Sequence, residues 1–136
     1  MNKVILALAA ACLSSSLLAQ SPPVSLKGHD PVAYFTDGRP VKGSPGINYD
    51  FDETRYLFAS QKNRERFASS PERYTPQFAG LCATGMSMGM KAEADPSVFK
   101  IIDGKLYVFS STQARDKVEK DPSLLAKSQQ NWQSRR

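Results

Sequence analysis

The chain has 136 residues, with 18 Lys or Arg against 13 Asp or Glu, so its formal net charge is +5. This length suits one domain with one core and leaves no room for two. The basic residues alternate with Asp and Glu instead of gathering on one stretch, which argues against a nucleic-acid-binding protein.

The first twenty residues have the layout of a secretory signal peptide. A positive charge at Lys3 precedes an apolar stretch over residues 4–12, and small residues follow near Ala19. The apolar stretch is shorter than the ~18 residues of a membrane-spanning helix. We therefore expect cleavage near residue 20 and a single mature domain over residues 21–136, periplasmic or secreted, with no transmembrane segment. Processing before Cys12, which would lipidate that cysteine, is the alternative.

Removal of the leader would leave Cys82 as the only cysteine of the mature chain. A single thiol cannot close an internal disulfide, so the stability of the domain has to come from its core. Such a thiol is buried and inert, paired with another molecule, or used chemically.

The first half of the mature chain predicts a strand, a hairpin and a helix. Pro31–Phe35 is a short apolar strand candidate, and a Pro- and Gly-rich connection follows over residues 40–46. Tyr49–Phe58 is a hairpin candidate that turns near its middle. Ser60 is placed to cap a helix over Gln61–Ser69.

The second half predicts a tighter hairpin and two helices. Val98–Phe109 turns at Asp103-Gly104, a pair that suits the positive backbone angles of a type I′ turn. Both faces of this hairpin are apolar, so we expect it to lie centrally in a sheet. Helices are predicted over Thr112–Lys120 and over Pro122–Trp132, and the last one should dock back on the sheet.

Part of the chain is duplicated. A shift of 51 positions places residues 52–74 on residues 103–125 without a gap, with six identities in 23 positions. The identical pairs are Asp52/Asp103, Tyr56/Tyr107, Phe58/Phe109, Ser60/Ser111, Arg64/Arg115 and Pro71/Pro122. The pattern predicts an α+β domain in which two hairpin-plus-helix units build a small antiparallel sheet with the helices packed on it. Specialised chemistry is then expected in the segment that the copies do not share.

That segment, residues 77–91, holds the mature cysteine and three of the four methionines. Thiolate and thioether groups are soft ligands that suit Cu(I), so copper is the candidate cofactor. The candidate metal ligands are Cys82, Met86, Met88 and His29, the last being the only histidine. The packing interpretation is favoured over metal binding, because Met fills irregular gaps in cores and His can satisfy a turn.

Cys82 and His29 are also candidate ligand-binding residues, and together they could form a thiolate nucleophile activated by a base. Asp30 is adjacent to His29 in sequence and is therefore badly placed to orient its ring, and Pro31 stiffens the backbone there. We predict a protein that acts without catalysis, and keep a thiol-dependent redox protein or enzyme as an alternative.

Several motifs, in order, resemble those of the exported YHS-domain proteins. They are Gly28-His29-Asp30-Pro31-Val32-Ala33-Tyr34-Phe35, the spaced residues of Tyr56–Tyr74, Gly80-Leu81-Cys82-Ala83, residues 102–107 and Asn131-Trp132. The resemblance covers nearly all of the mature chain. It implies a small domain that also occurs beside heavy-metal transport ATPases and is often suspected of binding metal, while the exported single-domain members mostly lack an assigned activity.

The chain departs from that family at two positions. The metal-associated branch has the pattern Tyr-x-Phe-Cys-Ser-x-x-Cys, and here Ala59 and Asn63 stand at its cysteine positions. Neither residue offers a soft ligand. The prediction is therefore a non-catalytic binding module for a small ligand, a metal ion or a partner protein. Copper binding through Cys82 and the methionines is one alternative, and thiol chemistry at Cys82 is the other.

Overall fold

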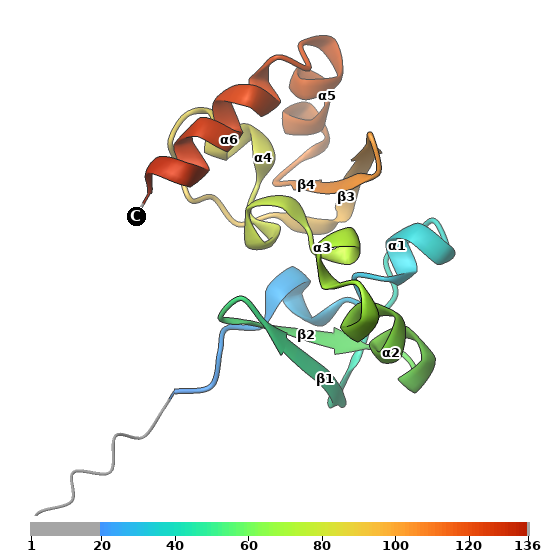
Figure 1. The fold of residues 1–136 in the computed structure, drawn as a ribbon. Coiled ribbons are helices and arrows are strands. Elements are labelled where there is room, and N and C mark those ends of the chain that lie inside the picture. Colours follow the sequence, from blue (N-terminus) through green and yellow to red (C-terminus); the bar gives the residue numbers. More distant parts are fainter. Residues whose placement is uncertain (1–19, 136) are drawn as a thin grey trace, which may run out of the picture.

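The same succession of elements occurs twice in the structure, a computed structural model that describes residues 20–135 (Figure 1). The N-terminal unit comprises η1 (Ser25–Gly28), α1 (Ala33–Thr36), β1 (Ser44–Phe51), β2 (Thr54–Phe58), α2 (Gln61–Ser69) and α3 (Pro71–Tyr74). The C-terminal unit comprises η2 (Gln77–Gly80), α4 (Ala83–Ser87), β3 (Asp95–Ile102), β4 (Lys105–Phe109), α5 (Thr112–Lys120) and α6 (Leu124–Ser134). The expected α+β class is confirmed. The predicted signal-peptide residues 1–19, with Cys12, lie outside the described residues.

The duplication extends further than the sequence shift indicates. Equivalent β-bridges occur in both units, Val24–Arg55 with Pro76–Leu106, and His29–Lys42 with Leu81–Glu93. The segment 77–91, expected to be unshared, is therefore the second copy of the segment that begins at η1. The spacing between equivalent residues falls from 52 (81 − 29) to 51 (93 − 42) along these segments. Because the spacing changes by one residue within these segments, the gapless shift of 51 positions does not detect this part of the duplication.

Both hairpins turn through two residues in the left-handed region. Asp52 and Glu53 have φ of 48° and 61°, and Asp103 and Gly104 have φ of 52° and 75°. Positive φ at both central residues is the type I′ signature expected at Asp103-Gly104. The helices predicted over Gln61–Ser69 and Thr112–Lys120 are confirmed. Their first turns are capped by Ser60 and Ser111, whose hydroxyls accept from the backbone N–H three residues on, each at 3.1 Å.

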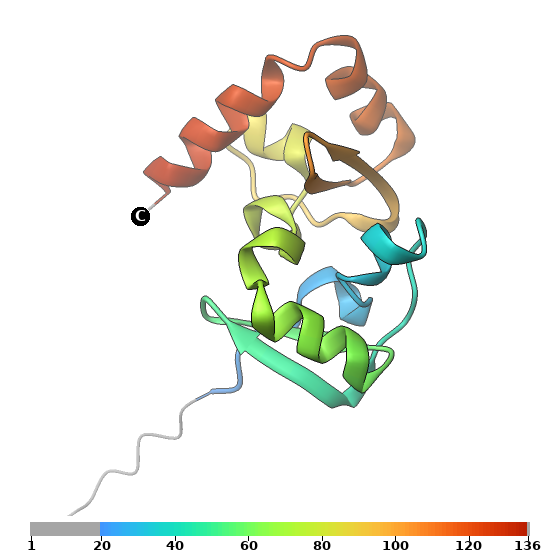
Figure 2. The same cartoon turned by 45° about the vertical axis from the view of Figure 1, so that its right-hand side comes forward.

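The hairpins form two separate two-stranded sheets, so the expected single sheet does not occur. The C-terminal hairpin is apolar on both faces for a reason other than a central place in a sheet. Tyr107 and Phe109 face a cluster shared with α4 and α5, whereas Leu106 and Val108 face Leu26 and Tyr34 of the N-terminal unit. Figure 2 shows this hairpin held between its own helices and the N-terminal unit. Burial on both faces is thus achieved by packing between units, not by strand neighbours.

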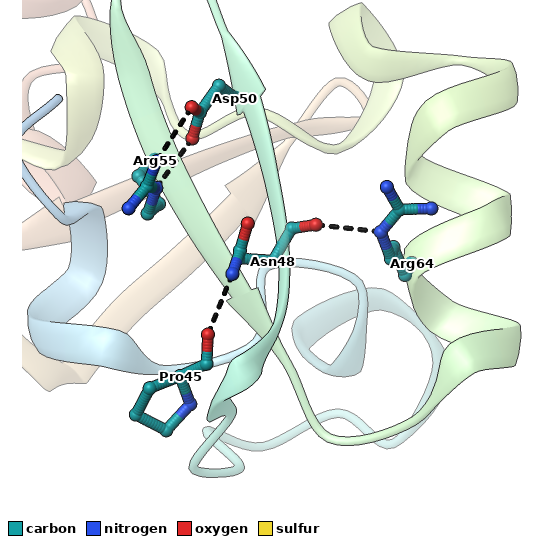
Figure 3. A network of polar contacts seen from close by, with 5 residues as sticks. All are labelled: Pro45, Asn48, Asp50, Arg55 and Arg64. Atoms are coloured by element: carbon teal, nitrogen blue, oxygen red, sulfur yellow. Dashed lines mark hydrogen bonds and ion pairs between the residues drawn. The ribbon is translucent and has the colours of Figure 1, made fainter. Parts of the chain in front are cut away.

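The outer face of the N-terminal hairpin is polar instead. Arg55 donates to both carboxylate oxygens of Asp50, at 2.7 and 2.9 Å, and this hydrogen bonding lowers the pKa of Asp50 (Figure 3). Beside the pair, Arg64 of α2 donates to the Asn48 carbonyl at 2.7 Å, which ties the helix to β1. The positions of Asp50 and Arg55 correspond to Ile101 and Leu106, where the C-terminal hairpin is packed against its neighbour. The two copies therefore share a backbone but not an environment.

Two predicted elements differ in the structure. The prediction of a strand over Pro31–Phe35 is wrong, because residues 33–36 form the helix α1. The last helix begins at Leu124, two residues later than expected, and it packs on α4 and the adjoining core instead of on the sheet. Its buried Ser128 donates to the Ala83 carbonyl at 2.7 Å, and Asn131 donates to the Met86 carbonyl at 2.8 Å. Thus α6 supplies donors to α4, a helix too short to satisfy its own carbonyls.

Left-handed turns lie where the two units meet. Leu26 and Lys27 in η1, and Phe78 and Ala79 in η2, have φ between 47° and 59°, and a glycine follows each pair. Each non-glycine residue in this region costs about 1–2 kcal/mol. The hydroxyl of Ser25 donates to the Ala79 carbonyl at 3.0 Å and links one turn to the other. Contacts between the units thus hold a backbone that the local sequence does not favour.

We expect Gly80→Ala to destabilise the domain more than Gly38→Ala. Both glycines have positive φ, +84° and +67°, so both variants carry the left-handed penalty. A Cβ at Gly80 would lie 2.7 Å from Ser25 Oγ, whereas a Cβ at Gly38 would have no heavy atom within 4 Å. Urea unfolding should show losses of about 2–4 kcal/mol and about 1–2 kcal/mol respectively. Equal losses would contradict the contact between η1 and η2.

Candidate functional site

A buried carboxylate organises the N-terminal unit. Asp30 precedes α1, and its side chain accepts from Val32 N at 2.8 Å, Ala59 N at 2.9 Å and the Asn63 amide at 2.8 Å. These donors come from the start of α1, the end of β2 and the first turn of α2. A buried charge is tolerated only when it is hydrogen-bonded in this way. Asp30 therefore joins three elements. Its bond to Val32 N caps the start of α1, which explains why residues 33–36 form a helix.

Cys82 occupies the equivalent position in the C-terminal unit. Its sulfur accepts from Gly85 N at 3.4 Å at the start of α4 and from Ser110 N at 3.2 Å after β4. Ser110 corresponds to Ala59, so the bond from Ser110 N to Cys82 is the counterpart of the bond from Ala59 N to Asp30. The side chain is 1% exposed and lies in an apolar cluster with Val118. This geometry gives Cys82 a structural role that needs no reactivity.

Of the four candidate metal ligands, the structure brings Cys82 and Met86 together in one buried cluster. Met86 is 2% exposed and belongs to the same cluster as Cys82, whereas Met88 is 60% exposed. The Nδ1 atom of His29 lies 2.9 Å from the Leu26 carbonyl, within the N-terminal unit. Its position in the duplication corresponds to Leu81, the neighbour of Cys82 in the other copy. Within residues 20–135, His, Cys, Asp and Glu form no group of three or more that could hold a metal ion.

A groove of about 780 Å³, here called the junction groove, lies between the two units. Its lining comes from the β1–β2 turn, the start of η2, the loop after α4 and the end of α6. In both views the turn of the N-terminal hairpin and the C-terminal end of α6 lie on the same side of the molecule (Figures 1 and 2). Because four distant segments contribute, no local motif marks this groove. Sequence reasoning missed it, although the chain's single tryptophan was a usable signal.

Trp132, the single tryptophan, anchors one wall of the junction groove. Its ring packs against Phe78 of η2 with centroids 6.1 Å apart, and the Arg135 guanidinium lies 3.2 Å from its centroid. Such cation–π stacking holds a cation beside an aromatic surface. The groove thus combines aromatic rings with charged and polar side chains.

No family model, no curated protein and no solved structure matches this chain. The geometry alone therefore carries the functional argument. Within residues 20–135, no helix has the length and apolar character that crossing a membrane requires.

Tyr56 lines the groove from the N-terminal unit, and its hydroxyl stays protonated at neutral pH. Burial, and secondarily the nearby Asp52 carboxylate, raise the pKa of Tyr56 from 10.0 to about 12. The phenol can therefore donate a hydrogen bond at the edge of the groove but cannot supply a phenolate.

We expect Cys82 to be protected from thiol reagents in the folded protein. In a Cys12→Ser background only Cys82 reports, and its burial should slow alkylation by on the order of a hundredfold or more relative to the urea-unfolded chain. The rate should follow the population of open states as urea is added. Alkylation within a few-fold of the unfolded rate would show an accessible thiol and contradict the structural role.

We expect stability to fall at alkaline pH as Tyr56 ionises. The folded pKa is raised, so the stabilisation is fully present below pH 10 and is lost as pH rises toward about 12. Two pKa units correspond to about 2–3 kcal/mol. Unfolding measured against pH should show a smaller alkaline loss in Tyr56→Phe than in the parent chain. Parallel pH profiles for the two chains would contradict the raised pKa.

Proposed function

We propose that this chain is an exported, non-catalytic binding domain of YHS type that holds a small ligand in the junction groove. The observation that carries the proposal is the groove itself, which has a volume of about 780 Å³ and aromatic walls from both units. Small-molecule sites have volumes of about 300–1,000 Å³ and combine apolar surface with a few polar groups. The leader-like first residues support export.

The surroundings of Cys82 give less support to thiol or copper chemistry. A nucleophile has to reach its substrate and a base, and this sulfur is buried and accepts two backbone N–H groups. Copper binding by the four candidate ligands would require the exposed Met88 to turn inward. It would also require the His29 ring to leave the Leu26 carbonyl. A groove that is already formed needs neither rearrangement.

Trp132 fluorescence tests the proposal directly, because the only tryptophan lines the groove. We expect at least one member of a panel of amino acids, sugars, organic acids and nucleosides to change its emission in a saturable way. The change should disappear in Gln77→Arg, which places a long side chain in the groove.

Gln113→Arg is the matched control, because it makes the same change on an exposed residue of α5 outside the groove. Its titrations should match those of the parent chain. A panel without any saturable response, or responses that persist in Gln77→Arg, would argue against the groove as the binding site.

A further inference from the structure

Three methionines occupy alternate positions in α4 and the loop after it, and the structure separates them. Met86 is 2% exposed and packs in the cluster that contains Cys82, whereas Met88 and Met90 are 60% and 55% exposed. Within residues 20–135, these two are the most exposed of the large apolar side chains. A methionine that stays in water forgoes the hydrophobic stabilisation that burial would give. Packing therefore accounts for Met86 but not for the other two.

The duplicated backbone does not require a methionine at the exposed position. The bridge residues that begin the two equivalent segments are 52 positions apart (81 − 29). The same spacing places the buried Met86 on the buried Tyr34, and it places Met88 on Thr36. Thr36 is exposed, and its hydroxyl donates to a backbone carbonyl of its own turn at 3.3 Å. The first copy thus has a polar side chain where the second presents a thioether to solvent.

Backbone hydrogen bonds hold the loop that carries the exposed methionines. The N–H groups of Met88 and Met90 both donate to the Gly85 carbonyl, at 3.0 and 2.9 Å. The N–H of Gly89 donates to the Met86 carbonyl at 3.0 Å. A chemical change at either exposed sulfur therefore leaves these hydrogen bonds in place and removes no side chain from the core.

The reaction open to an exposed thioether is oxidation by a peroxide. The sulfur lone pair attacks one peroxide oxygen, the O–O bond breaks, and the departing hydroxide takes the proton of the transferred oxygen. Sulfur loses two electrons, and the products are methionine sulfoxide and water. Two thiols reverse the change, since the sulfoxide oxygen leaves as water while the thiols become a disulfide. The polar sulfoxide is costly in a core but is readily solvated at a surface.

We propose that Met88 and Met90 form a reversible modification site, which takes up oxygen from peroxides while the fold stays intact. Neither residue lines the junction groove, so this site is separate from the proposed ligand site. Met86 and Cys82 lie buried in one cluster and stay reduced under the same exposure. The segment thus divides its sulfur atoms between an unreactive interior and a reactive surface.

Peroxide treatment of the folded Cys12→Ser chain, with each methionine followed by peptide mass, tests this site. Met88 and Met90 should each gain one oxygen atom at a rate within about threefold of that in the urea-unfolded chain. Met86 should react at least about tenfold more slowly than when unfolded, because only open states expose it. Similar rates for all three methionines in the folded chain, or protection of the two exposed ones, would overturn the proposal.

Two matched variants assign the uptake to its residues. Met88→Leu with Met90→Leu should abolish the fast uptake of two oxygen atoms. Met86→Leu is the control and should retain that uptake in full, because leucine replaces methionine in a core at nearly constant volume. Fast uptake that survives the double variant would place the reactive sulfur elsewhere and overturn the assignment.

The oxidised chain tests the intact fold and the reversibility. Its urea midpoint should equal that of the untreated chain, since no buried side chain is altered. The two methionine sulfoxide reductases, one for each sulfoxide epimer, should remove both oxygen atoms from the folded chain when a dithiol is supplied. A lowered midpoint with only Met88 and Met90 oxidised would contradict the intact fold, and sulfoxides that resist both reductases would contradict a reversible site.

Discussion

One hydrogen-bond acceptor at the start of each short helix holds the rest of each unit in place. In the N-terminal unit it is the carboxylate of Asp30, and in the C-terminal unit it is the sulfur of Cys82. Each acceptor receives the N–H that follows the second strand, so it fixes the hairpin relative to the short helix. The left-handed turn that precedes the acceptor is held at both ends by β-bridges to its own unit, in addition to the hydrogen bond that links the two turns.

The two acceptors meet the same geometric demand with different chemistry. A buried carboxylate must have several donors to offset its loss of hydration, and Asp30 has the amide of Asn63 in addition to backbone groups. A thiol is cheaply desolvated and takes weaker hydrogen bonds, so Cys82 suits a cluster of apolar side chains. Cys82, the only cysteine of residues 20–135, therefore stands at the duplicated structural position that Asp30 holds in the other unit. Uniqueness alone does not make it a centre of chemistry.

Function in this fold is better sought where the duplication is broken. The C-terminal hairpin is buried on both faces, whereas the N-terminal hairpin keeps a polar outer face with the Asp50–Arg55 pair. After α3 the chain passes directly into η2, but α6 continues to Ser134 and carries Trp132 toward the first hairpin. These differences open the junction groove between the units.

Local sequence signals determined the parts of this protein that depend on neighbouring residues. The Asp103-Gly104 turn, the helices capped by Ser60 and Ser111 and the α+β class all follow from backbone preferences acting over a few positions. Tertiary structure alone decided what depends on distant residues. Residues 33–36 form a helix because Asp30 is held by groups near residues 59 and 63, and the apolar C-terminal hairpin is covered by another unit instead of by further strands. The junction groove is assembled from four segments that lie far apart in the chain, so no pattern within any one of them could reveal it.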